Sequence, residues 1–335
     1  MKEVTFEDYL EYVRKNREIV IEDQVIKLEP IEVKRLEPLP EELNDVTTTV
    51  WSFPRRGSWA THRGDYRGNW APQIPRALML MYTKPGDTVL DPMVGSGTTL
   101  IEAKLLGRNS IGVDISYNAV MLTLHRLYYL EKALEEYKKR RANVLLAFMH
   151  DELNNGIGGV SLRDIEKAWF KVYHGDARNL NELDDESIDM VATHPPYFNI
   201  IRYGEETFEG DLSKARSLEE YLKWMSEVAT ELYRVLKPGK YCAVLIGDTR
   251  IHRHYVPISH YVLQVFLNAG FILKEEIIKV QHKMKTTREV WNRLRERDFL
   301  LIYHEKLFVF RKPESEEKLD EVKYSRKLDL IKLDF

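Results

Sequence analysis

The residue types that could do chemistry gather in two short stretches of this chain. Residues 91–99 read Asp-Pro-Met-Val-Gly-Ser-Gly-Thr-Thr, and residues 194–197 read His-Pro-Pro-Tyr; each follows an apolar run that predicts a buried strand. Glycines let a backbone pass close to a ligand and turn helix amides toward it. Paired prolines fix φ twice and so hold a carbonyl oxygen in place without a later ordering cost. The two stretches predict a ligand cradle and a rigid loop that presents an imidazole, a carbonyl and a phenol ring.

Acidic residues follow further apolar runs. Asp114, Asp176 and Asp248 stand, like Asp91, at the carboxyl ends of expected strands. In open α/β sheets ligands bind beyond these ends, so we expect the four carboxylates and the 194–197 loop to line one cleft. Asp114 and Asp176 also have an alternative role as caps of the helices that follow them, which is a common duty for Asp.

Strands and helices alternate along most of the chain. Strands are expected at 88–90, 110–113, 172–176, 187–193, 241–246, 271–280 and 306–310. Helices are expected at 75–82, 98–106, 218–236 and 255–269. A further long amphipathic helix is marked by the three-to-four spacing of apolar residues from Val120 to Tyr137. This alternation predicts the α/β fold class, with a mostly parallel sheet covered by helices on both faces.

We expect three parts in the chain. Residues 1–73 form an N-terminal extension that ends in an aromatic and basic segment. Residues 74–312 form the α/β domain, with a helical insertion at 116–170, and residues 313–335 form a charged C-terminal tail. The tail, from Arg311 onward, is expected to be loosely ordered.

Bulk properties narrow the class of protein. The 335 residues are 44% hydrophobic and 31% charged, as in a globular protein, and the net charge is -3. Any affinity for nucleic acid must therefore come from a local basic patch. The single cysteine, Cys242, excludes an internal disulfide and lies in an apolar run, which indicates a core thiol. With no signal peptide and no apolar run of about 20 residues, we expect a cytoplasmic protein without membrane contact. Dense Lys and Glu with little Cys would suit a thermophile.

A basic and aromatic stretch precedes the glycine turn. Residues 51–76 hold five arginines and three tryptophans. Arginines that contact phosphate and aromatics that stack on unpaired bases are the ingredients of RNA or single-strand recognition. We therefore expect substrate contacts from Arg55, Arg56, Trp59, Arg63 and Arg67. Alternatively, the tryptophans pack the N-terminal segment onto the domain while the arginines are solvated. The stretch is also placed to close over one end of a ligand in the glycine turn. A second basic region, 283–297, contains Trp291.

The order of these motifs is itself informative. Strand, Asp-Pro-x-x-Gly-Ser-Gly-Thr-Thr, helix, Leu-Gly-Arg and Ile-Gly-Val-Asp follow one another through residues 86–118, with His-Pro-Pro-Tyr later. This order resembles S-adenosylmethionine-dependent methyltransferases that modify exocyclic amines of nucleic-acid bases. The resemblance implies a Rossmann-like class I methyltransferase fold, S-adenosylmethionine as cofactor and no metal. A nicotinamide oxidoreductase is the alternative from another enzyme class, but the third glycine of Gly-x-Gly-x-x-Gly is missing and the 194–197 loop would be unexplained.

The resemblance also implies cofactor contacts. Gly95 and Gly97 would flank the methionine and ribose portions. Asp114 would accept hydrogen bonds from the ribose hydroxyls, and Asp176 from the adenine amino group, whereas Asp91 would orient the turn or the cofactor amine. The full set of expected cofactor-binding residues is Asp91, Pro92, Gly95, Ser96, Gly97, Thr98, Asp114, Asp176 and Ala177.

In this family, the first loop residue and a proline carbonyl accept hydrogen bonds from the target amine, and the aromatic stacks on a flipped base. By resemblance, His194, Pro195, Pro196 and Tyr197 are the catalytic set. The family usually has Ser, Asp or Asn where His194 stands. A neutral imidazole can still accept one hydrogen bond, although a purely structural histidine is the alternative. Asn199 and Tyr203 follow the loop and are expected to line the base pocket.

The substrate is expected to be RNA rather than DNA. Relatives that act on DNA usually carry a separate target-recognition domain, which we do not find in the sequence. Thr193 and Tyr197 resemble the setting of the loop in cytosine-amine enzymes, and the whole chain resembles archaeal cytidine-amine methyltransferases. We therefore expect methylation of N4 of cytosine in RNA, such as ribosomal RNA. A DNA N4-cytosine or N6-adenine modification methylase and a non-catalytic RNA-binding protein are the alternatives, and the oligomeric state is open.

Overall fold

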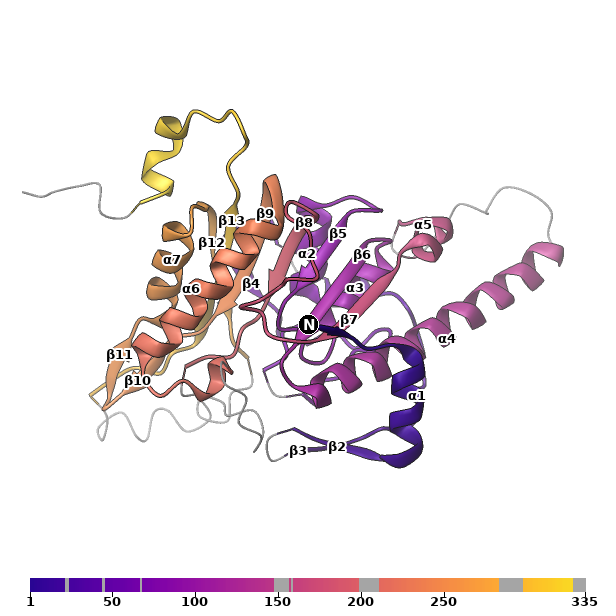
Figure 1. Cartoon of the computed structure of the whole chain (residues 1–335). Helices are drawn as coiled ribbons and strands as arrows, with labels where there is room; N and C mark the ends of the chain where they lie inside the picture. Colours follow the sequence, from indigo (N-terminus) through magenta and orange to yellow (C-terminus); the bar gives the residue numbers. More distant parts are fainter. Residues whose placement is uncertain are drawn as a thin grey trace, which may run out of the picture.

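A computed structural model describes residues 1–21, 24–43, 46–66, 68–147, 157, 159–198, 211–282 and 298–327, with backbone alone for 142–147. Its centre is a nine-stranded sheet with helices packed against it (Figure 1). The strands lie in the order β1-β7-β6-β5-β8-β9-β13-β12-β4. Their bounds along the chain are β1 (Lys2–Glu3), β4 (Val50–Ser52), β5 (Thr88–Asp91), β6 (Asn109–Asp114), β7 (Phe170–His174), β8 (Ile188–Thr193), β9 (Leu236–Ile246), β12 (Ile272–Val280) and β13 (His304–Arg311).

The middle of this sheet is parallel, as the sequence predicts. β5 pairs in parallel with β6 and β8, and further parallel pairs join β6 to β7 and β8 to β9. β13 runs antiparallel between β9 and β12, and β1 runs antiparallel to β7. The carboxyl ends of β5 to β9 therefore meet at one edge of the sheet, which is where the predicted ligand groups stand.

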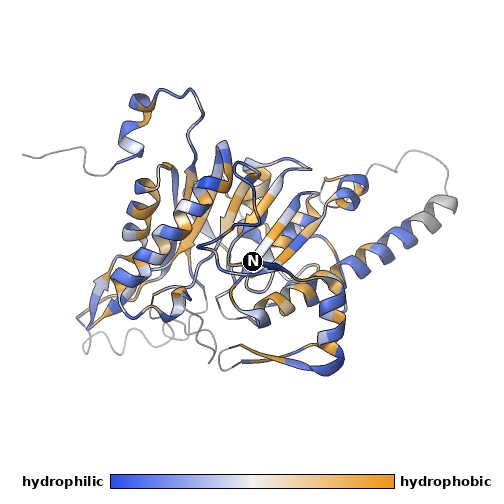
Figure 2. Ribbon diagram, in the orientation of Figure 1, coloured by the Kyte–Doolittle hydropathy of each residue, from blue (hydrophilic) through white to orange (hydrophobic). Residues whose placement is uncertain are grey.

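Two hydrophobic cores form because successive strand side chains point to opposite faces of the sheet. Val89 and Met190 belong to one core, whereas Leu90 and Val191 belong to the other. The first core is covered by α2 (Gln73–Tyr82), α3 (Thr98–Leu105) and α4 (Tyr117–Ala147), and the second by α6 (Leu218–Val235) and α7 (Ile258–Asn268). Apolar residues dominate the strands between these layers (Figure 2). Each fully buried aliphatic side chain stabilises the fold by about 1.5–3 kcal/mol.

The N-terminal residues contribute to both edges of the sheet. β1 pairs with β7 at one edge, and β4 pairs in parallel with β12 at the other. Between them, α1 (Phe6–Lys15) and the hairpin of β2 (Glu18–Ile21) and β3 (Gln24–Lys27) pack on α4. The remaining short elements are η1 (Pro40–Glu42), α5 (Leu162–Lys167), η2 (Leu212–Lys214), β10 (Thr249–Ile251), β11 (His254–Val256) and η5 (Leu319–Ser325).

Two expectations about local structure are wrong. The helix expected from Tyr255 begins at Ile258, because Val256 precedes a proline and such residues are pushed out of the helical region. The chain after Arg311 is ordered as far as 327: Arg311 pairs with Glu317, and η5 follows. Lys312 is buried, where its ammonium donates to two backbone carbonyls at the end of α6. Within the described residues, no helix is both long and apolar enough to cross a membrane.

Candidate active site

The glycine turn joins β5 to α3. Gly95 has φ 54° and Gly97 has φ 81°, conformations that favour glycine. Buried Asp91 holds the turn, because its carboxylate accepts from the Met93 amide at 3.2 Å and from the Thr99 hydroxyl. Burial raises the pKa of this carboxyl to about 7. Asp91 therefore orients the turn, which is one of the two roles expected for it.

Asp114 ties the turn to the end of the neighbouring strand β6. Its Oδ2 accepts from the Gly95 amide at 2.8 Å, and its Oδ1 accepts from the Ser116 amide at 2.9 Å. Burial raises the pKa of Asp114 to about 6, although the residue stays partly exposed. A carboxylate offers about four acceptor positions, so two remain for a ligand. The Ser116 contact is not the cap of α4, because the Oγ of Ser116 itself accepts from the Ala119 amide at 3.4 Å.

Asp176 lies at the next strand end. The Gly175 amide donates to the Asp114 carbonyl at 2.9 Å, which places Asp176 and Ala177 directly beyond the end of β6. The Asp176 carboxylate accepts from the backbone amide of Arg178 at 2.9 Å and from its guanidinium at 2.7 Å. The sequence did not lead us to expect Arg178, which restrains the carboxylate while leaving part of it exposed.

The aromatic and basic stretch lies over the glycine turn, as one interpretation of the sequence expected. The Asn69 amide donates to Ser96 Oγ at 3.3 Å. The ring of Tyr66 lies 3.1 Å from the point where a Cβ on Gly95 would stand. Arg126 of α4 donates to the Ser96 carbonyl at 3.1 Å and pairs with Asp65. Neighbours from two distant segments therefore cover the turn that carries Ser96.

Trp59 and Arg56 are not surface contacts, which corrects their expected role. Trp59 is fully buried, and its indole donates to Glu102 of α3 at 2.7 Å. His62 and Arg76 bind the same carboxylate at 2.7 and 3.0 Å. Burial, together with nearby Arg126, lowers the pKa of Arg56 to about 10, and its guanidinium donates to backbone carbonyls. The alternative, in which the tryptophans pack the N-terminal segment onto the domain, describes Trp59, whereas Arg56 is neither a surface contact nor solvated.

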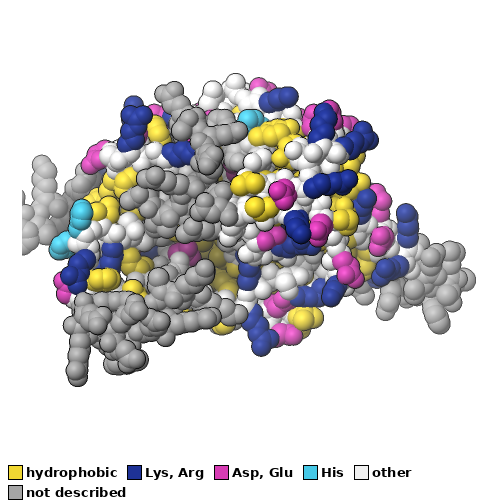
Figure 3. All heavy atoms as spheres, turned by 90° about the horizontal axis from the view of Figure 1, so that it is seen from below, with side chains coloured by type: hydrophobic (Ala, Val, Ile, Leu, Met, Phe, Trp, Pro, Cys, Tyr) yellow, Lys and Arg dark blue, Asp and Glu magenta, His cyan; other side chains and the backbone are white. Residues whose placement is uncertain are grey.

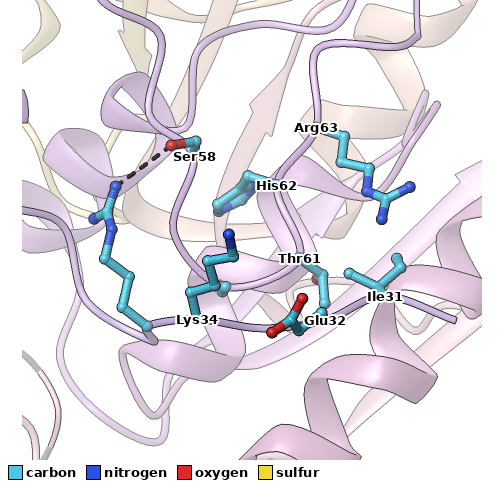
Figure 4. A pocket seen from close by; sticks show the side chains of 9 residues that line it. Ile31, Glu32, Lys34, Ser58, Thr61, His62 and Arg63 are labelled. Carbon is cyan, nitrogen blue, oxygen red and sulfur yellow. Dashed lines mark hydrogen bonds between the residues drawn. The ribbon is translucent and has the colours of Figure 1, made fainter.

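The other arginines that were expected to contact the substrate have different surroundings. Arg55 and Arg63 are exposed, and Arg67 lies outside the described residues. Arg63 borders a cavity of about 270 Å³ whose lining residues are Ile31, Glu32, Lys34, Arg35, Ser58, Ala60, Thr61, His62 and Arg63. In Figure 4 the Lys34 side chain extends toward His62, whereas Arg63 extends away from it. This cavity lies beside the N-terminal segment and shares only Arg63 with the expected site.

The His-Pro-Pro-Tyr loop begins where β8 ends, and its two ring side chains meet. Nε2 of His194 lies 2.6 Å from the Tyr197 hydroxyl, which in turn donates to Oε1 of Glu305 at 2.7 Å. Oε2 of Glu305 accepts from the Lys279 ammonium at 2.7 Å. Trp70 stacks beside the imidazole, with ring centroids 6.0 Å apart. Glu305 and Lys279 were not expected at the site; β12 and β13 each contain several ionisable residues, so the sequence carried no signal that singled these two out.

Electrostatics keep the imidazole neutral and the carboxylate ionised. Burial, opposed by Glu305 and assisted by Lys279, lowers the pKa of His194 to about 4. Burial would raise the pKa of Glu305, but Lys279 and His194 together with two hydrogen bonds hold it at about 2. At neutral pH the four groups therefore carry one negative and one positive charge.

The loop carbonyls and Tyr197 have different surroundings. The Tyr221 hydroxyl donates to the Pro196 carbonyl at 3.0 Å, whereas no donor to the Pro195 carbonyl is found among the described residues. Tyr197 is buried, and a Cβ on Gly247 would stand 2.6 Å from its ring. Gly247 therefore makes room for this ring. Asn199 and Tyr203 lie outside the described residues.

Asp248 follows β9 at the same edge of the sheet. Its carboxylate accepts from the Ser259 amide at 2.7 Å and from the Tyr255 hydroxyl. These contacts hold the start of α7, so Asp248 supports this helix rather than lining the expected ligand cleft.

A parallel sheet centre with acidic residues beyond the carboxyl ends of neighbouring strands is the architecture of doubly wound α/β proteins, in which ligands bind at those ends. Within that class the chain belongs to the DNA methylase family, whose model matches residues 4–124 and 188–333. A second model, described as an RMKL-like methyltransferase domain, matches residues 65–237.

Curated relatives carry names that refer to both DNA and RNA. The chain is similar to type II methyltransferase M.BglII of Bacillus subtilis, at 29% identity over 47% of this chain and 39% of that one. It is 34% identical to DNA adenine methyltransferase YhdJ of Escherichia coli, over 34% of this chain and 40% of the relative. It is also 34% identical to tRNA (guanine(10)-N2)-dimethyltransferase of Methanocaldococcus jannaschii, over 38% of this chain and 28% of the relative. The chain thus spans less than half the length of each.

Solved structures are similar at lower identity. A SAM-dependent methyltransferase from Methanosarcina mazei matches with a TM-score of 0.41 and 17% identity, over 71% of this chain and 97% of that one. A putative DNA modification methylase from Thermus thermophilus, complexed with S-adenosyl-L-methionine, matches with a TM-score of 0.32 and 24% identity, over 43% of this chain and 56% of that one.

Proposed function

We propose that this protein is an S-adenosylmethionine-dependent methyltransferase that acts on the exocyclic N4 amine of cytosine in RNA. The observation that carries the proposal is a pair of open acceptors in the loop after β8. Nδ1 of His194 is buried and makes no hydrogen bond within the described part of the chain, and the Pro195 carbonyl accepts none there either. Nε2 of His194 and the Pro196 carbonyl, by contrast, already have partners.

The residues of the glycine turn fit the proposed cofactor. Gly95 and Gly97 give the turn its positive φ angles, and their missing side chains leave room for Tyr66 and Thr123. Asp114 retains acceptor capacity for two hydroxyl groups, as a ribose presents. At the start of α3, the buried hydroxyl of Thr98 has no partner among the described residues, so a further polar ligand atom could be satisfied there. When bound, S-adenosylmethionine supplies an electrophilic methyl group on a sulfonium.

The loop residues make the target amine a better nucleophile. The lone pair of an exocyclic amine is delocalised into the base, so the free amine reacts poorly. His194 Nδ1 and the Pro195 carbonyl accept hydrogen bonds from the two N–H groups of the amine. These bonds pull the nitrogen toward a tetrahedral geometry, which frees the lone pair. The activated amine would then take the methyl group that the cofactor supplies, and the Nδ1 lone pair of His194 would accept one amine proton before its release to water. Preorganised acceptors of this kind contribute about 100- to 1,000-fold each.

Nucleic acid would approach over the N-terminal cover of the glycine turn. Arg55 and Arg63 are the exposed arginines of that cover, and Lys34 borders the same cavity as Arg63. Phosphate contacts from such side chains supply affinity that depends on salt. Elsewhere charge is mixed: on the face shown in Figure 3, basic and acidic side chains alternate. A cluster of this size supports contact with a few phosphates rather than a long duplex.

A DNA amino-methyltransferase is the second candidate, and two findings favour it. The matched family is described as DNA methylase, and relatives similar to this chain include enzymes named for DNA. RNA is favoured by the similarity to a tRNA enzyme.

The deciding experiment offers labelled S-adenosylmethionine with total RNA and, separately, with genomic DNA, and identifies the methylated nucleoside by mass spectrometry. We expect label in N4-methylcytidine from RNA. Label confined to DNA would replace the proposal with the second candidate, and label in an adenine or guanine nucleoside would refute the target base.

A further inference from the structure

We infer that Glu305 and Lys279 are positioning residues that hold His194 as the Nε2–H tautomer, so that Nδ1 is the acceptor presented to the target amine. The inference rests on the proposed function for its consequence, but its structural content concerns only these side chains. It assigns a role to two charged residues of β12 and β13 that the methyl-transfer chemistry itself does not use.

Counting protons along the chain of contacts gives the tautomer. Lys279 can only donate, and ionised Glu305 can only accept. The Tyr197 hydroxyl has one proton, which it donates in the hydrogen bond to the Glu305 carboxylate 2.7 Å away. The Tyr197 oxygen is then left as an acceptor for His194, whose Nε2 lies at 2.6 Å. Nε2 must therefore carry the single proton of the neutral ring, and Nδ1 must carry the lone pair.

The opposite tautomer is disfavoured by the same geometry. If Nδ1 held the proton, Nε2 would have to accept a hydrogen bond from the Tyr197 hydroxyl. The phenol oxygen would then face an ionised carboxylate at 2.7 Å with no hydrogen between them. The Gly68 backbone is placed to accept from a protonated Nδ1, but no hydrogen bond of normal geometry joins the two. The chain of hydrogen bonds from Lys279 through Glu305 and Tyr197 to His194, here called the relay, thus determines which imidazole nitrogen carries no proton.

The relay is held by rigid elements. Lys279 and Glu305 are direct partners in the antiparallel register of β12 and β13. The Glu305 side chain is 8% exposed and that of Lys279 is 17% exposed. The Tyr197 ring is seated on Gly247, and Trp70 stacks on His194. Charges buried at this depth and fixed by sheet pairing are costly to misplace, which suits them to orient a neighbour.

Substitution of Glu305→Gln tests the idea, because the amide has one accepting and one donating end. The Lys279 ammonium needs an acceptor, so the Gln carbonyl turns toward it and the NH2 group turns toward Tyr197. The phenol then donates its proton to His194 Nε2, which moves the ring proton to Nδ1. This nearly isosteric substitution is thereby expected to reverse the tautomer, so that Nδ1 of His194 carries the proton and can no longer accept a hydrogen bond.

The measurement is long-range ¹⁵N–¹H NMR of protein labelled in its histidine rings, with the His194 signals assigned by their loss in His194→Asn. The wild-type protein should show a protonated Nε2, and Glu305→Gln a protonated Nδ1, with no substrate or cofactor present. Wild-type protein in the Nδ1–H form, or a Glu305→Gln variant with an unchanged ring, would overturn the inference whatever the enzyme methylates.

Activity supplies the second readout. We expect Glu305→Gln to lower kcat by about 100-fold or more while the affinity for S-adenosylmethionine is retained. Adding Lys279→Met frees the Gln amide to turn its carbonyl to Tyr197, so the double variant should regain Nε2–H signal and part of kcat. A double variant as impaired as Glu305→Gln would refute the orienting role of Lys279.

A matched control lies on the same two strands. Glu276 pairs with Lys306 at 3.0 Å between β12 and β13, away from Tyr197. Glu276→Gln removes one Glu–Lys pair of the sheet and should change neither the tautomer nor kcat. If both Gln variants lose activity equally, the effect belongs to the sheet and the inference fails. If the tautomers behave as expected but His194→Ala retains full activity, the proposed function fails instead.

Discussion

Gly247 offers the sharpest test of how the catalytic loop is built. A Cβ added there would stand 2.6 Å from Cε2 of Tyr197 and 3.1 Å from two other ring carbons. Carbon atoms in contact normally lie about 3.5–4.0 Å apart, so Gly247→Ala requires the ring to move by about 1 Å. The backbone of Gly247 does not have a positive φ, so the effect is one of space alone.

The Tyr197 ring cannot make that shift freely, because its hydroxyl is bound at 2.6 Å to His194 and at 2.7 Å to Glu305. Overpacking of this kind costs about 1–3 kcal/mol of stability. A displacement of about 1 Å among catalytic groups costs about 100-fold in rate. We therefore expect Gly247→Ala to remain folded, to be less stable by that amount, and to lose about 100-fold in kcat.

The assay pairs urea unfolding with methyl transfer at saturating S-adenosylmethionine. Gly64→Ala is the matched control, since a Cβ there would meet the Arg56 side chain at an ordinary 3.5 Å. It should behave as wild type in both measurements. If Gly247→Ala kept kcat within about twofold of wild type and the same unfolding midpoint, the described contact between Gly247 and Tyr197 would be refuted.

Four further predictions follow from the same geometry. Asp114→Ala should weaken S-adenosylmethionine binding in calorimetry without unfolding the protein, since the Gly95 amide loses its acceptor; unchanged affinity would argue against Asp114 as a ligand. His194→Ala should abolish methyl transfer and spare cofactor binding, and wild-type turnover would end its catalytic assignment. Glu102→Ala leaves Arg76 and His62 without their buried partner and should cost about 3–5 kcal/mol in denaturant unfolding; a loss below about 1 kcal/mol would contradict it. Because the pKa of His194 is near 4, its Nδ1 stays an acceptor down to about that pH, so kcat at saturating cofactor should show no acid limb near pH 6.5 from this group.

The sequence predicted what depends on neighbours along the chain. The glycine turn, the double proline and the acids after the strands are local patterns whose geometry follows from φ restriction and strand ends. The order of strands and helices followed from hydrophobic periodicity, and the parallel centre of the sheet followed from their alternation.

What the sequence did not show depends on contacts between distant residues. Glu305 stands 108 residues from Tyr197 in the chain, and only the pairing of β13 beside β9 brings them together. Composition alone also cannot tell a stacking tryptophan from a packed one, so Trp59 was expected at the surface although it binds Glu102 in the core. The short edge strands β1 and β4 have too few residues to show any periodicity.

Those edge strands bear on how the chain is made. β1 and β4 are synthesised first, yet their sheet partners β7 and β12 emerge from the ribosome much later. β1 and β4 therefore remain unpaired until β7 and β12 have been synthesised. Pairings between residues so distant in the sequence form slowly. Once in place, β1 pairs with the last two residues of β7 and β4 with the last three residues of β12, so each covers only part of the edge of its partner strand. A segment that is translated before its partner strands is thus among the last to join the sheet, and it supplies the outermost strand at each end.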